Sequence, residues 1–323
     1  TQVWVKDDGR NPTGSLKDRA SALVTARAMA QGTEVITTAS TGNAAAALAG
    51  LTASVGLPAA IFVPASAPEA KIAQLLTYGA KVLLVQGNYD AAFDLAVEAA
   101  ERYGWYNRNT GMNPYTLEGK KTVSFEIAEQ LKWQSPDAVV VSVGDGNIIS
   151  GVHKGFRDLL ALGWIDRMPR LIGVQASGSA ACYDVWKRGG DPAQMQPINA
   201  QTVADSISAD LPRDRVKAVR AVRETGGAFV SVPDDAILAG IPKLARLSGV
   251  FAEPAGAAVY AGARAALAEG AIASSERVVL LVTGNGLKDI KSAMRVAGAG
   301  YPVAPDMGEV EKARLALGLP TFR

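Results

Sequence analysis

The chain has 323 residues, of which 48% are hydrophobic and 20% charged, so it is long enough for two domains and apolar enough for a large core. Its 33 Lys and Arg residues nearly balance its 31 Asp and Glu residues, which argues against a nucleic-acid-binding surface. One cysteine and one histidine exclude a disulfide framework, a thiolate metal cluster and most zinc sites and catalytic triads. No apolar run approaches the ~20 residues that cross a bilayer. We therefore expect a cytoplasmic protein that binds no metal, nucleic acid or membrane.

Short apolar runs alternate with longer amphipathic stretches along most of the chain. Residues 3–6 already have the pattern of a strand and Thr1 is not Met, so we expect a further N-terminal segment before this sequence. The other predicted strands are 34–39, 59–63, 81–85, 138–143, 170–175, 228–232 and 277–283. The predicted helices are 42–54, 69–77, 89–102, 117–132, 151–162, 215–225, 234–248 and 255–269. This alternation predicts an α/β fold with parallel sheets.

Two polar, turn-rich segments, 107–114 and 188–201, interrupt the alternation. They predict a small α/β domain over about residues 37–120 and a large domain formed by residues 1–36 and 121–323.

The segment NPTGSLKDR, residues 11–19, combines a polar turn with the start of an Ala-rich helix. Ser15 is a suitable N-cap for that helix. Lys17 would then lie in the first turn, where the helix dipole disfavours a cation. The segment predicts either an ordinary surface lysine or an amine made less basic, as a Schiff-base nucleophile requires.

Two further loops each follow a predicted strand and open a predicted helix. The first offers small residues and backbone N–H groups of the kind that bind anions: Ser40, Thr41, Gly42, Asn43 and Ala44. The second is a Gly-rich loop of the kind that cradles a phosphate: Gly144, Asp145, Gly146, Asn147 and Ile148. It matches neither the dinucleotide fingerprint nor the nucleoside-triphosphate loop. A plain capped turn is the alternative for the first loop.

The last predicted strand ends at Thr283, within the motif TGNGLKD of residues 283–289. Ligands of open α/β sheets bind beyond the carboxyl ends of the strands. A neutral hydroxyl such as that of Thr283 would suit a ring nitrogen that must stay unprotonated, whereas a tight turn without function is the alternative.

Taken together, the four segments resemble the pyridoxal-phosphate enzymes of the tryptophan synthase β type, known as fold type II. The resemblance extends from residue 6 to about residue 300. Within that group, the motifs NPTGSLKDR, LEGKKT and LVTGNGLKD are similar to those of threonine synthases. The resemblance implies a two-domain α/β fold with open parallel sheets flanked by helices, pyridoxal 5'-phosphate as cofactor, a small amino-acid substrate and a homodimer.

The resemblance also implies a role for each matching residue. Lys17 would form the Schiff base with the cofactor and then move protons. Asn43 would hydrogen-bond the 3'-oxygen of the cofactor, and Thr283 would face the pyridine nitrogen. The cofactor phosphate would lie on Gly144, Asp145, Gly146, Asn147 and Ile148. The substrate carboxylate would lie on Ser40, Thr41, Gly42 and Ala44.

The sequence departs from threonine synthases at two positions. The family commonly has a threonine where Ala44 stands and an arginine where Thr116 stands, and both help to bind the phosphate of O-phosphohomoserine. A threonine cannot replace the bidentate clamp of an arginine. We expect the missing charge to come from one of four residues, Lys120, Lys121, Arg108 or Lys154.

The expected reaction is therefore that of threonine synthase, from O-phosphohomoserine and water to L-threonine and phosphate. A serine/threonine dehydratase or a β-replacement enzyme is the first alternative, because the Gly-rich loop has dehydratase spacing. A non-catalytic binding protein is the second, and Lys17 argues against it. Glu253 is a weaker site candidate, while we interpret His153 and Cys182 as structural.

Overall fold

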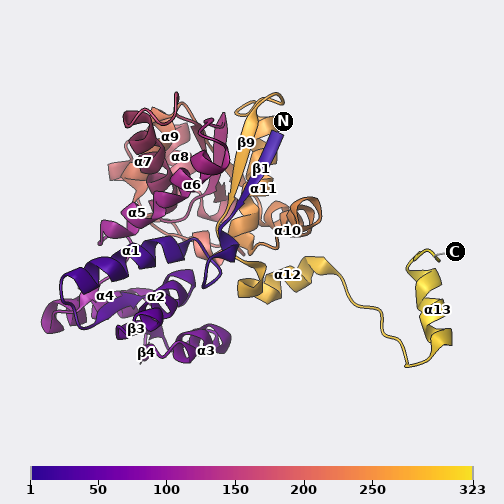
Figure 1. The fold of residues 1–323 in the computed structure, drawn as a ribbon, viewed down its shortest axis with the longest axis horizontal. Helices are drawn as coiled ribbons and strands as arrows, with labels where there is room; N and C mark the ends of the chain where they lie inside the picture. The colour runs from indigo at the N-terminus through magenta and orange to yellow at the C-terminus, as the bar shows by residue number, and fades with distance from the viewer. Residues whose placement is uncertain (1, 322–323) are drawn as a thin grey trace.

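The computed structural model describes residues 2–321, which form two separate parallel sheets with helices on both faces (Figure 1). The larger sheet has the strand order β1-β9-β6-β7-β8 and the smaller sheet the order β4-β3-β2-β5. The strands of the larger sheet are β1 Gln2–Asp7, β6 Ala138–Ser142, β7 Arg170–Ala176, β8 Ala228–Val232 and β9 Arg277–Val282. Those of the smaller sheet are β2 Ile36–Ala39, β3 Ala59–Pro64, β4 Lys81–Val85 and β5 Tyr106–Asn107. Every pairing between them is parallel, which confirms the predicted fold class.

The described part of the chain contains thirteen α-helices. Those that lie between β1 and β6 in the chain are α1 Lys17–Ala30, α2 Asn43–Ser54, α3 Glu69–Thr77, α4 Tyr89–Tyr103, α5 Tyr115–Lys120 and α6 Thr122–Gln130. The remaining helices are α7 Asn147–Ala161, α8 Ala181–Lys187, α9 Arg215–Glu224, α10 Asp234–Ser248, α11 Pro254–Ala268, α12 Ile290–Ala297 and α13 Met307–Ala316.

The larger sheet is buried on both faces because its central strands are continuous runs of aliphatic residues. All five residues of β6 are buried. One face packs against α6, α7, α8 and α9 around Phe156 and Phe229. The other face packs against α10 and α11, whose Ala-rich surfaces allow a close approach. Figure 1 shows these two helix groups on opposite sides of β9.

The smaller sheet is covered by α2 and α3 on one face and by α4 on the other. Helix α1 precedes this sheet in sequence and packs against both α2 and α5. The chain therefore builds two sheets, and the division into a small domain over about residues 37–120 and a large domain stays a prediction.

Most predicted strands lie within one or two residues of the observed ones, and three corrections concern helices. The predicted helix 117–132 is two helices, α5 and α6, and it ends at Gln130 because Lys132 and Trp133 have positive φ of 56° and 64°. The predicted helix 151–162 begins four residues earlier, at Asn147. Helices α8, α12 and α13 were not predicted, and neither was β5, whose two residues carry no periodic pattern.

The C-terminal part leaves the body of the molecule after α12, and α13 lies apart from both sheets (Figure 1). Among the described residues, none of the helices combines the length and the apolar character that a membrane span requires.

Candidate active site

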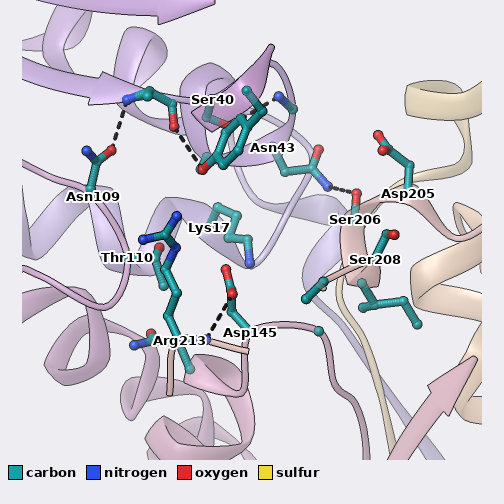
Figure 2. Close-up of a pocket in the computed structure, with 18 of the residues that line it drawn as sticks. Lys17, Ser40, Asn43, Asn109, Thr110, Asp145, Asp205, Ser206, Ser208 and Arg213 are labelled. Carbon is teal, nitrogen blue, oxygen red and sulfur yellow. Dashed lines mark hydrogen bonds between the residues drawn. The ribbon is translucent and has the colours of Figure 1, made fainter. Parts of the chain in front are cut away.

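A cavity of about 650 Å³ opens where the carboxyl ends of β2 and β6 face each other. This is the position at which open α/β sheets bind their ligands. Figure 2 shows Lys17, Ser40, Asn43 and Asp145 in its wall. The residues predicted from the sequence that line it are Lys17, Ser40, Thr41, Gly42, Asn43, Ala44, Gly144, Asp145, Gly146, Asn147 and Ile148. Three segments far apart in sequence therefore meet at one cavity.

Lys17 is the first residue of α1, and its backbone is tied to the end of β9. The N–H of Leu16 donates to the carbonyl of Thr283 at 2.9 Å, and Ser15 forms an antiparallel bridge with Gly284. The N-cap is Leu16 and makes no side-chain cap, so the prediction of Ser15 as N-cap was wrong: its backbone pairs with the turn after β9 instead.

The environment of Lys17 lowers the pKa of its amine. Burial is the main cause, and the positive charge of Arg108 adds to it, while Asp145 and Glu253 act in the opposite direction. The positive end of the α1 dipole also disfavours the charged form. A larger neutral fraction is what an amine needs in order to attack a carbonyl carbon.

The loop between β2 and α2 leaves a helix start open toward the cavity. Gly42 is the N-cap of α2 and provides no side chain, so the first N–H groups of the helix remain available to an anion. A Cβ added at Gly42 would meet nothing within 4 Å. Ser40 Oγ accepts the N–H of Gly42 at 3.2 Å and so holds the loop in place.

Asn43 lies next to Glu253, which the sequence ranked as a weaker candidate. Asn43 Nδ2 donates to Glu253 Oε1 at 2.8 Å and to Ser206 Oγ at 3.5 Å. Glu253 is 5% exposed, and burial raises its pKa to about 7. Glu253 can pack this closely against residue 284 only because that residue is glycine, since a Cβ at Gly284 would lie 2.2 Å from Glu253 Oε1. A carboxyl group that changes charge near neutral pH therefore contacts a predicted site residue.

The Gly-rich loop has the features of a phosphate cradle. Gly146, at φ 88°, is the N-cap of α7 and leaves the first N–H groups of that helix without a side-chain cap. A Cβ at Gly144 would lie 2.8 Å from the Cα of Ile207. Ser142 Oγ, also in the cavity wall, is buried without a hydrogen-bond partner. An uncapped helix start beside an unsatisfied hydroxyl fits the phosphate monoester of pyridoxal phosphate.

Other residues hold this loop in place. Asn147 accepts the amine of Lys120 through Oδ1 and donates through Nδ2 to Asp214 at 2.6 Å. The N–H of Arg213 donates to Asp145 Oδ1 at 3.2 Å. In Figure 2 the carboxylate of Asp145 faces the amine of Lys17.

Thr283 does not line this cavity, and neither does the weaker candidate Glu253. Thr283 is 7% exposed, and its backbone carbonyl holds the turn before Lys17. Its role toward a ring nitrogen stays a prediction.

The sequence did not assign Asn109, Ser142 or the segment 205–211, all of which line the cavity. Asn109 Oδ1 accepts from Thr38 Oγ1 at 2.8 Å and from the N–H of Ala39 at 2.9 Å, while its Nδ2 is buried without a partner. The polar run at 107–114 was the available signal, and by itself it predicted only a junction between domains.

The residues interpreted as structural lie away from the cavity wall. His153 is buried against Glu224, with Nε2 and Oε2 3.3 Å apart, and burial lowers its pKa. Burial raises the pKa of the Cys182 thiol to about 12, which makes it a poor nucleophile. The described residues contain no group of three or more side chains that could hold a metal ion.

The family model described as "Pyridoxal-phosphate dependent enzyme" matches residues 1–284. The chain belongs to this family, with the fold type II architecture and its pyridoxal-phosphate cofactor. Within the family it is a threonine synthase-like lyase.

The relatives that support this placement are all threonine synthases. The one from Methanocaldococcus jannaschii is 39% identical over 96% of this chain and 76% of its own length. The one from Methanosarcina acetivorans is 42% identical over 91% of this chain and 73% of its own length. The one from Mycobacterium tuberculosis H37Rv is 36% identical over 97% of this chain and 85% of its own length.

Solved structures confirm the fold. The processed form of threonine deaminase isoform 2 from Solanum lycopersicum superposes with a TM-score of 0.76 at 23% identity, over 98% of this chain and 79% of that one. Maize serine racemase superposes with a TM-score of 0.73 at 22% identity, over 98% of this chain and 87% of the racemase chain.

Proposed function

We propose that this chain converts O-phosphohomoserine and water to L-threonine and phosphate. The observation that carries the proposal is the single cavity in which Lys17, with its lowered pKa, lies between two uncapped helix starts. One helix start suits the phosphate of the cofactor, and the other suits the carboxylate of an amino acid. The threonine synthases related to this chain support the choice of reaction.

In this reaction the bond between the γ-carbon and the phosphate oxygen breaks, and water adds at the β-carbon. Pyridoxal phosphate, when bound, withdraws electrons from the amino acid and so makes its side-chain hydrogens acidic. Lys17 would hold and return the protons, because its amine lies in the cavity and burial lowers the pKa of that amine. Ser40, Thr41, Gly42 and Ala44 would orient the substrate carboxylate, and Asn43 the cofactor oxygen.

Thr283 is proposed to face the pyridine nitrogen of the cofactor. A neutral hydroxyl leaves that ring largely unprotonated, which favours elimination at the side chain over transamination.

A serine/threonine dehydratase is the second candidate. Ala44 lines the cavity without a hydroxyl, and Thr116 is absent from its wall. Both positions lack the groups that commonly bind the substrate phosphate in threonine synthases.

Substrate tests separate the two candidates. The holoenzyme is given O-phosphohomoserine, L-threonine and L-serine separately, and the release of phosphate and of 2-oxo acid is measured. The proposed function predicts rapid phosphate release with threonine formed and little 2-oxobutyrate. Release of 2-oxobutyrate or pyruvate from the unphosphorylated amino acids, with no turnover of the phosphate ester, would establish the dehydratase. If the purified protein shows no visible absorbance band of the bound cofactor, both enzyme candidates are excluded and the non-catalytic binding protein is the remaining interpretation.

We propose that a second copy of this chain is the partner. Helix α13 has only ten residues and exposes Met307, Val310 and Leu315. Isolated helices of this length are marginal in water, so a surface that covers α13 would stabilise it. Sedimentation of the holoenzyme as a monomer at micromolar concentration would refute the homodimer. The proposed compartment is the cytoplasm, where a buried, reduced Cys182 is the ordinary state.

A further inference from the structure

A phosphate ester substrate requires a cation in the cavity wall, and two of the four predicted candidates are engaged elsewhere. Lys121 Nζ lies 2.8 Å from Glu118 and 2.9 Å from Asp158. Lys154 Nζ lies 3.2 Å from the same Glu118. Neither lysine lines the cavity. These two charges therefore stabilise contacts between helices rather than a ligand.

Lys120 is fully buried, but its amine donates to Asn147 Oδ1 and it does not line the cavity. Thr116 is also fully buried, and its hydroxyl donates to the carbonyl of Asn113 at 2.7 Å. Lys120 therefore supports the Gly-rich loop, and Thr116 supports the turn at the start of α5.

Arg108 is the remaining candidate, and it does line the cavity. The backbone N–H of Arg108 donates to the carbonyl of Thr37 at 2.8 Å. This bond extends the pairing of β5 with β2 and fixes the position of the Arg108 backbone. The residue is 1% exposed. Nε donates to Ser21 Oγ at 3.4 Å and Nη1 to Thr110 Oγ1 at 3.1 Å.

The Nη2 group of Arg108 has no hydrogen-bond partner. Among the described residues no carboxylate forms an ion pair with this guanidinium. Burial lowers the pKa of Arg108 to about 10, so the group remains charged at neutral pH. A buried, unpaired cation is unfavourable in a folded protein, and an anion bound beside it removes that penalty.

A second unsatisfied donor lies next to Arg108 in sequence. Asn109 Nδ2 is buried without a partner, and Asn109 also lines the cavity. Three of the four carboxylates in the same wall have donors of their own: Asp145 accepts the N–H of Arg213, Asp205 pairs with Lys71 at 2.8 Å, and Asp210 accepts the N–H of Ala200 at 2.8 Å. The wall at residues 108–109 thus offers donors that the protein itself leaves unused.

We propose that Arg108 binds the phosphate of the substrate and determines specificity for phosphate monoesters of a short amino acid. This inference rests on the proposed function. Arg108 supplies from the end of β5 the charge that threonine synthases commonly supply from the position of Thr116. Its planar guanidinium offers several N–H donors, which match the oxygens of a phosphate.

The test compares Arg108→Met, Arg108→Lys and, as a control, Arg102→Met, which changes an exposed arginine on α4. For each holoenzyme we would measure KM and kcat with O-phosphohomoserine, the inhibition constant of inorganic phosphate, and the Kd of L-threonine from the cofactor absorbance. Arg108→Met is expected to raise the KM and the phosphate inhibition constant about 10- to 100-fold. The Kd of L-threonine, which has no phosphate, should change less than about twofold. For Arg108→Lys, the KM and the phosphate inhibition constant should lie between those of the wild type and those of Arg108→Met. The control variant Arg102→Met should match the wild type.

Thermal unfolding distinguishes binding from structural support. Without phosphate, Arg108→Met should melt at the wild-type temperature or above it, because an unpaired buried charge has been removed. Inorganic phosphate should raise the melting temperature of the wild-type holoenzyme and of the control, and not that of Arg108→Met. Loss of stability in both Arg108 variants with an unchanged response to phosphate would overturn the inference. So would unchanged KM and inhibition constants.

Failure of the proposed function gives a different result. The wild type would then not release phosphate from the ester, while inorganic phosphate would still stabilise it through Arg108.

Discussion

Glu253→Gln should remove a pH-dependent loss of stability from the protein. Glu253 is 5% exposed and accepts a hydrogen bond from Asn43 Nδ2 at 2.8 Å. Burial raises its pKa to about 7, and the bond from Asn43 and the charges of Lys288 and Lys17 counteract this only in part. Glutamine has nearly the same shape, keeps an acceptor for Asn43 and carries no charge.

The size of the effect follows from the pKa difference between the folded and unfolded states. Between pH 4.5 and 7 the folded protein holds a proton on Glu253 that the unfolded chain has released. The free energy of unfolding therefore falls as the pH rises through this window, by about 3 kcal/mol in total. Glu253→Gln lacks this contribution, so its stability relative to the wild type should increase by the same amount from pH 4.5 to 8.

Urea unfolding of the cofactor-free proteins, measured from pH 4.5 to 8.5, provides the assay. Glu98→Gln, an exposed position on α4, is the matched control and should follow the wild type at every pH. Parallel curves for Glu253→Gln and the wild type would refute the reasoning, because they would mean that Glu253 has the same pKa in the folded and unfolded states.

Three further predictions concern the site and the packing beneath it. Lys17→Ala should abolish the visible absorbance of the bound cofactor and all turnover while circular dichroism stays unchanged; a persistent band that borohydride removes would contradict it. Thr283→Asp should raise transamination relative to elimination, measured as the ratio of pyridoxamine phosphate to phosphate released, and a constant ratio would argue that Thr283 does not face the ring nitrogen. Gly119→Ala should destabilise the protein by about 3 kcal/mol, because its Cβ would lie 2.2 Å from the carbonyl oxygen of Arg19 across the contact of α5 with α1. Gly300→Ala, with nothing within 4 Å of the added atom, is the control in chemical denaturation.

The sequence predicted the regular elements well where a local pattern controls them. The runs in β6 and β9 are aliphatic because both faces are buried, so their composition alone identifies them as strands. Where the tertiary structure controls an element, the pattern was insufficient. Strand β5 has two residues and exists because it pairs with β2. Helix α5 is separated from α6 near Gly119, where the backbone of α1 approaches closely.

The same distinction applies to the site. Lys17 and the two loops were predictable because each is a short motif at the start of a helix, and the chemistry of such a motif is local. The contact of Asn43 with Glu253 joins residues that are 210 positions apart, and no local pattern encodes it. The sequence could not distinguish among the four cationic candidates for binding the substrate phosphate, because the charge of a residue does not show where its side chain lies. Only the folded chain separates Lys121 and Lys154, which meet carboxylates, from Arg108, whose Nη2 group is buried in the cavity wall without a partner.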